Sequence, residues 1–110
     1  MLKEAKLALR ISTERYDAEI AGLILAGADD LRLVGIPVDG ISLTVTDGVV
    51  YDESTIDDAL VIRAIITYVR THFGSPNDYD RLKAAYDEQK TQMKTSSLYA
   101  LRDEDEGGNA

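Results

Sequence analysis

The chain has 110 residues with no cysteine and one histidine, and its 12 basic and 20 acidic residues give a formal net charge of −8. This length fits one domain, and the lack of cysteine excludes disulfides, thiolate metal sites and a cysteine nucleophile. One histidine excludes most His-based zinc sites, and an acidic chain lacks the basic surface that binds nucleic-acid phosphates.

The composition and the N-terminal sequence set the expected location. Hydrophobic residues make up 45% of the chain and charged residues 29%, as in soluble globular domains. No run approaches the roughly 18 apolar residues of a membrane-spanning helix. The opening MLKEAKLALR has charges where a signal peptide needs an apolar stretch. We therefore expect no membrane association and a protein that works in the compartment where it is made.

The first third of the chain predicts a short helix followed by a long one. Residues 2–10 have the apolar spacing of a short helix. Ser12 is a suitable N-cap for a helix over about residues 13–34, whose apolar stripe is about 100° wide. Gly22 and Gly27 lower helix propensity in that segment. We interpret them as points of close packing against another helix, or alternatively as a hinge.

Residues 35–54 change character. Apolar residues alternate with Ser and Thr over 41–46, then Asp47-Gly48 precedes a second β-forming run. Asp-Gly between alternating β-formers is the strongest short hairpin signal, and we predict a β-hairpin at 41–51. Because an isolated two-stranded hairpin is marginal in water, it should pack on the helices, pair with another chain, or remain a flexible loop.

The helix predicted at about 56–73 is unusually apolar. Thr55 and Asp58 form a capping pattern before it, and Gly74 ends it. Its apolar residues and His72 spread over roughly 200° of a helical wheel, whereas a surface helix needs a stripe only a little over 100° wide. This helix should therefore be covered on more than one side.

These elements predict an all-α fold, a small helical bundle with a hairpin insertion. The central helix is flanked by the helix at 13–34 and by a solvent-facing helix at about 76–94, and a neighbouring copy could supply the remaining cover. We assign residues 1–98 to the helical domain. Residues 99–110, which include the run DEDE, have the composition of a disordered acidic tail.

Side chains that could carry catalysis are few. His72 lies in the apolar arc, and we interpret it as a core or interface histidine and not as a base. The adjacent pairs Asp29-Asp30 and Asp57-Asp58 point in different directions on a helix and cannot chelate as pairs, so solvated or capping roles are expected. No G-x-S-x-G, Walker or G-x-G-x-x-G motif is present in the sequence. We expect no enzyme, metal site or cofactor.

Arg63, Thr67 and Arg70 share the narrow polar strip of the central helix. In one interpretation the two arginines are exposed or pair with acids of the same chain. In the other they meet carboxylates of a neighbouring subunit, which a guanidinium can bind bidentately. Such pairs would mainly fix the register of an interface and exclude wrong partners.

Three segments together resemble a known family. The opening LKEAKLALRIST with YDAEIAGLILAGADDLRLVGI, the block DDALVIRAIITYVRTHFG, and YDRLKAAYDEQKTQM occur in the order and spacing of the head–tail connector (head-completion or DNA-packaging) proteins of tailed bacteriophages. The resemblance covers residues 2–36 and 55–94, and residues 37–54 depart from the family pattern.

The resemblance implies a structural protein of the virion, at the head–tail junction, that is present in the host cytoplasm during assembly. It implies a cyclic homo-oligomeric ring below the portal protein that docks a tail-side head-completion protein and helps retain packaged DNA. Duplex DNA would pass through without specific binding, because acidic walls repel phosphates. The acids expected at the lumen are Asp87, Glu88, Asp103, Glu104, Asp105 and Glu106.

Two other classes of function stay open from the sequence. A monomeric acidic helical adaptor or regulator that binds a basic partner would need an acidic or amphipathic segment that folds on binding, and only the DEDE run fits. A small enzyme would depend on His72 alone.

Overall fold

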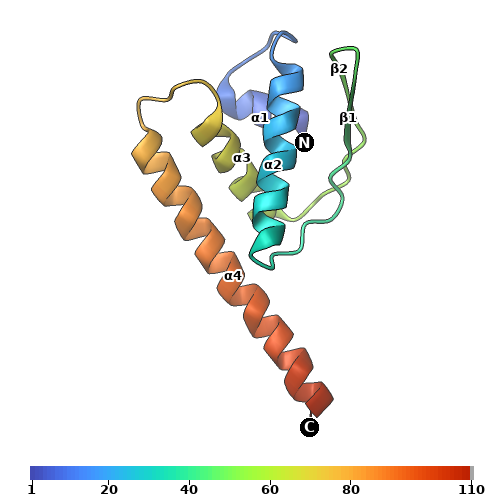
Figure 1. The fold of residues 1–110 in the computed structure, drawn as a ribbon, viewed down its shortest axis with the longest axis vertical. Coiled ribbons are helices and arrows are strands. Elements are labelled where there is room, and N and C mark those ends of the chain that lie inside the picture. Colours follow the sequence, from blue (N-terminus) through green and yellow to red (C-terminus); the bar gives the residue numbers. More distant parts are fainter. Residues whose placement is uncertain (110) are drawn as a thin grey trace.

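Across residues 1–109 the computed structural model contains four helices and one two-stranded antiparallel sheet (Figure 1). The elements are α1 (Leu2–Leu9), α2 (Asp17–Leu33), β1 (Leu43–Thr46), β2 (Val49–Asp52), α3 (Ala59–His72) and α4 (Tyr79–Asn109). The structure describes the backbone of residues 1–109 and the side chains of residues 1–95. The prediction of a mostly helical chain with a hairpin is confirmed. The bounds of α4 run past the predicted end near residue 94.

Two helices start later than predicted because other residues cap them. Asp58, and not Thr55, is the N-cap of α3, and its Oδ1 accepts hydrogen bonds from the amides of Leu60 and Val61 at 3.1 and 3.2 Å. The N-cap of α2 is Tyr16, without a side-chain cap bond, so Ser12 does not cap that helix. Which residue caps each helix depends on where the chain turns into that helix. The local sequence pattern did not show the position of these turns.

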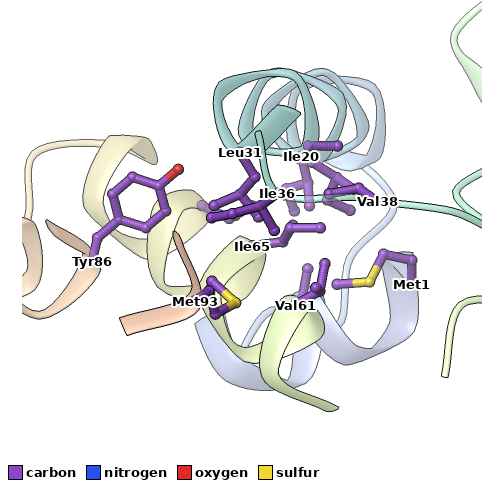
Figure 2. Packing of buried hydrophobic residues seen from close by; sticks show 14 residues of the cluster. Met1, Ile20, Leu31, Ile36, Val38, Val61, Ile65, Tyr86 and Met93 are labelled. Carbon is purple, nitrogen blue, oxygen red and sulfur yellow. The ribbon is translucent and has the colours of Figure 1, made fainter. Parts of the chain in front are cut away.

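The hydrophobic core forms around α3 (Figure 2). Ala64, Ile65 and Val69 of α3 are fully buried, and α2 packs against them. Further buried core side chains come from α1, α2, the loop after α2, and α4, and they are Ala5, Ile20, Ile24, Ala28, Leu31, Ile36, Val38, Tyr86 and Met93. The wide apolar arc of α3 is therefore covered from three directions, by α1, α2 and α4.

The two glycines of α2 have different surroundings. A Cβ on Gly27 would lie 3.0 Å from Cδ1 and 3.1 Å from Cγ of Tyr68 on α3. Close packing is therefore the reason for this glycine, as predicted. A Cβ on Gly22 would meet nothing within 4 Å, and the residue is exposed. The close-packing interpretation is wrong for Gly22.

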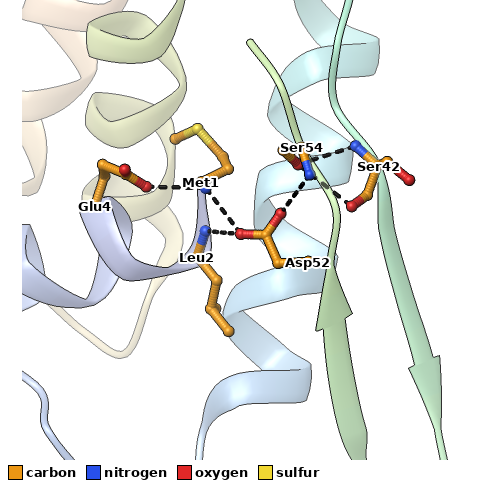
Figure 3. A network of polar contacts seen from close by, with 6 residues as sticks. All are labelled: Met1, Leu2, Glu4, Ser42, Asp52 and Ser54. Carbon is orange, nitrogen blue, oxygen red and sulfur yellow. Dashed lines mark hydrogen bonds and ion pairs between the residues drawn. The ribbon is translucent and has the colours of Figure 1, made fainter. Parts of the chain in front are cut away.

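The hairpin leans on the helical body. Its turn uses Asp47 (φ 53°) and Gly48 (φ 78°), the two positive φ angles that a type I′ turn requires. On β2 the carboxylate of Asp52 accepts hydrogen bonds from the Met1 amine at 2.8 Å and the Leu2 amide at 2.7 Å (Figure 3). This polar contact joins the hairpin to the start of α1, so the first of the three predicted outcomes, packing on the helices, holds.

Candidate assembly surface

A groove of about 510 Å³ runs between α3 and α4. The groove combines apolar side chains with three arginines and one carboxylate. The lining residues are Asp57, Ala59, Ile62, Arg63, Ile66, Thr67, Arg70, Arg81, Leu82, Ala85 and Gln89. Because the whole chain has a net charge of −8, a groove with an excess of arginine is a distinct feature of its surface.

The structure brings the three predicted interface residues, Arg63, Thr67 and Arg70, into this one groove. Both arginines are exposed, and neither forms an ion pair with any side chain in residues 1–95. Arg81 of α4, by contrast, pairs with Asp78, the residue that precedes this helix. Of the three arginines in the groove, Arg63 and Arg70 are therefore the two without an ion pair in residues 1–95, and their guanidinium groups can bind an external carboxylate.

Thr67, which the sequence places on the polar strip of α3, is buried. Only 8% of Thr67 is exposed, and Thr71 is 3% exposed. The hydroxyl of Thr67 donates to the carbonyl of Arg63 at 3.0 Å, and that of Thr71 donates to the carbonyl of Thr67 at 2.7 Å. A threonine that satisfies its hydroxyl within its own helix can be buried cheaply. Thr67 therefore forms part of the groove wall, and the positive charge of the groove comes from the arginines.

A second hollow of about 370 Å³ adjoins the first and shares Arg63 and Gln89 with it. Its other lining residues include Leu60, which is 63% exposed, and Met93. The apolar surface that α3 does not bury intramolecularly therefore lies along its junction with α4.

A polar cluster that the sequence did not predict joins α2 to α4. The hydroxyl of Tyr86 donates to Oδ2 of Asp30 at 2.5 Å, and the ammonium of Lys90 donates to the same oxygen at 3.2 Å. Burial raises the pKa of Asp30, but these two hydrogen bonds outweigh it and leave the pKa below its ordinary value. The interpretation of Asp30 as a solvated acid is wrong.

His72 lies beside this cluster and is exposed, so it is not a core histidine, and its interpretation as an interface histidine stays a prediction. Its ring stacks at a tilt on Tyr68, with 4.3 Å between ring centroids, and Tyr68 in turn meets Tyr86 edge-on at 5.3 Å. Within side chains 1–95 no three His, Cys, Asp or Glu residues come together as a metal site would need.

The acids predicted for a DNA lumen fall into two groups. Asp87 pairs with Lys83 at 3.0 Å on α4, and Glu88 is exposed. Neither lines the groove or its neighbouring hollow. The side chains of Asp103, Glu104, Asp105 and Glu106 lie outside the described residues.

Comparison with known proteins decides the family. Residues 1–100 match the phage connector protein family. The chain belongs to that family. The match includes residues 37–54, the hairpin region that departs from the family pattern noted in the sequence. This region is therefore part of the matched connector segment. No curated protein and no solved structure gave a significant match.

As a phage connector, the protein has a structural role in the phage particle and associates with other head or tail proteins. Within the described residues, none of the connector's helices is both long enough and apolar enough to span a bilayer. The groove between α3 and α4 combines apolar side chains with arginines, a residue type that is enriched at protein–protein interfaces.

Proposed function

We propose that this connector forms a ring below the portal of a tailed phage, links the DNA-filled head to the tail, and helps retain packaged DNA. The observation that carries the proposal is the groove between α3 and α4, where Arg63 and Arg70 lie exposed beside apolar side chains. The proposal also depends on membership of the phage connector family. Its portal-side and tail-side partners would be the portal protein and the next head-completion protein.

A ring accounts for the partial cover of α3. Heterologous contacts between identical subunits close into a ring when the rotation between neighbours is an integral fraction of a turn. Each subunit would then cover the groove of the next, and the guanidinium groups would meet carboxylates away from bulk water, where they set register and reject wrong partners.

The negative charge of the connector fits a channel for DNA. A duplex must slide through the lumen without adhering, and acidic walls repel phosphates. We assign the lumen to Asp87, Glu88 and the acids at 103–106, the latter in the acidic C-terminal segment 99–110. The protein would be located at the head–tail junction of the virion, and in the host cytoplasm during assembly.

The mass of the purified protein, measured by light scattering over a wide concentration range, tests this function. A discrete large oligomer is the expected result. If the protein is a monomer, capture by portal-bearing capsids becomes the deciding assay, because the portal can template the ring. A monomer that such capsids do not capture would contradict the proposal and favour an acidic adaptor with a basic protein partner.

A further inference from the structure

The hairpin and the α3/α4 groove lie on opposite flanks of the subunit. In Figure 1, the hairpin forms the right edge of the molecule, α4 forms the left edge, and α2 lies between them. The groove opens where α4 meets α3. Two different surfaces on opposite flanks are the arrangement that a repeating head-to-tail contact requires.

The outer face of the hairpin is exposed and carries a tyrosine and a valine beside two threonines. The register pairs Thr44 with Tyr51 and Thr46 with Val49, so these four side chains share one face. Tyr51 is 55% exposed and Val49 52%. The opposite face carries Asp52, which holds the Met1 amine, so the body of the subunit binds that face and leaves the outer one without a partner in the described residues.

The charges of the two surfaces are opposite. Residues 39–54, the hairpin and its flanks, contain four acids and no Lys, Arg or His. Asp52 is used inside the subunit, whereas Asp47 at the turn and Glu53 after β2 are exposed. In the groove, Arg81 is paired with Asp78, and Arg63 and Arg70 stand against the single carboxylate of Asp57.

We infer that the hairpin of one connector subunit docks into the α3/α4 groove of a second copy, with Tyr51 and Val49 against Ile62 and Ile66. The carboxylates of Asp47 and Glu53 then pair with Arg63 and Arg70. A tyrosine buried in an apolar pocket is the kind of anchor that dominates binding energy in protein interfaces, and charged pairs at the rim fix its register. The inference rests on the proposed ring and assigns its contact surfaces.

The chain contains no cysteine, so single cysteines can report the contact without a background reaction. Val49→Cys places a thiol on the outer face of the hairpin, and Ala59→Cys places one at an exposed position in the groove. The two single variants are mixed with a short thiol-reactive cross-linker. Leu33→Cys, at the 84% exposed C-terminal end of α2, replaces Val49→Cys in the control mixture.

The expected product is a cross-linked pair of Val49→Cys with Ala59→Cys, in excess of either homodimer and of the Leu33→Cys control. A chain that carries both cysteines should give a ladder of covalent oligomers. Homodimers in equal yield, or equal cross-linking by Leu33→Cys, would overturn the assignment of surfaces. Circular dichroism of each variant shows that its fold is retained.

In a second experiment, one variant has a disabled hairpin surface and the other has a disabled groove. Tyr51→Ser removes the anchor of the hairpin, and Arg63→Glu with Arg70→Glu reverses the charge of the groove. Each variant alone should lose the large oligomer, and their mixture should give a 1:1 dimer joined by the two intact surfaces. If both variants still form the large oligomer of the wild type, the hairpin–groove contact is wrong but the proposed ring is not. If the wild-type protein is a monomer that capsids do not capture, the proposed ring itself is contradicted.

Discussion

The hydroxyl of Tyr86 on α4 donates a 2.5 Å hydrogen bond to the carboxylate of Asp30 on α2, across 56 residues of sequence. Lys90, one turn further along α4, reaches the same oxygen at 3.2 Å. The contact places two side chains of α4 on a single carboxylate of α2. Since the groove lies between α3 and α4, this contact also fixes one wall of the proposed assembly surface.

Removal of the Tyr86 hydroxyl should weaken the docking of α4. A hydrogen bond to a charged group contributes about 1.5–3 kcal/mol, and Lys90 remains to pair with Asp30, so Tyr86→Phe should lower the free energy of unfolding by about 1–2 kcal/mol. Urea denaturation measures this change. Tyr79→Phe, an exposed tyrosine on the same helix, is the matched control and should unfold like the wild type. Equal stability of the two variants would contradict the role given to the Asp30 contact.

Asp52 should give the stability of the protein a defined pH dependence. Burial raises the pKa of Asp52, but hydrogen bonds from the Met1 amine, Ser54 and Leu2 outweigh it and hold the pKa well below its ordinary value. A carboxylate with a lowered pKa in the folded state stabilises the protein above its unfolded-state pKa of about 4, and this contribution is lost as the pH falls toward the folded-state pKa.

The Met1 amine shows the opposite dependence. Burial lowers its pKa, but hydrogen bonds to Asp52 and Glu4 leave the pKa raised. Its contribution is complete below about pH 8 and is lost as the pH rises through the raised pKa. Asp52→Asn should therefore cost roughly 1–3 kcal/mol between about pH 5 and 7, with a smaller difference from wild type at both extremes. A difference that is constant from acid to alkaline pH in urea titrations would show that the carboxylate charge is not responsible.

The two glycines of α2 provide a matched pair of substitutions. Gly22→Ala places a methyl group in open space and should stabilise the helix by roughly 0.5–1 kcal/mol. Gly27→Ala pushes against the ring of Tyr68, which cannot move freely because His72 and Tyr86 contact it. Overpacking of about 1–3 kcal/mol then exceeds the helix gain, so this variant should be less stable than the wild type. Thermal melts of both variants test the pair, and stabilisation by Gly27→Ala would refute the packing argument.

The local sequence predicted the helices and the hairpin because each depends on neighbouring residues. The Asp47-Gly48 turn and the apolar arc of α3 are examples, since periodicity and turn chemistry are sufficient for both. Contacts between distant segments were missed. Asp30 was interpreted as solvated because only the packing of α4 brings Tyr86 to it. The exposure of His72 was missed for a related reason, since a wheel shows which residues share a face but not where the covering helices end.

Charge reversal in the groove should separate assembly from folding. Arg63→Glu with Arg70→Glu places carboxylates where the proposed interface needs guanidinium groups, and like charges at a contact cost several kcal/mol. The variant should lose the oligomer and keep its circular dichroism spectrum, because both side chains are exposed. Lys3→Glu with Lys94→Glu changes the net charge equally at exposed positions that do not line the groove, and should assemble normally. Assembly by the arginine variant would remove both residues from the interface.

Neutral side chains at the proposed lumen should make DNA adhere to the ring. The acids at 103–106 contribute half of the net charge of −8, and their replacement by Asn and Gln reduces the repulsion of phosphates without adding a basic group. The variant ring should keep its mass and retain duplex DNA more strongly, most clearly at low salt, where charge is least screened. Asp87→Asn with Glu88→Gln tests the second lumen group against Glu14→Gln with Glu19→Gln, two exposed acids elsewhere. If the two double variants retain DNA equally, Asp87 and Glu88 do not face the passing duplex, and an unchanged retention after replacement of 103–106 would exclude the tail as well.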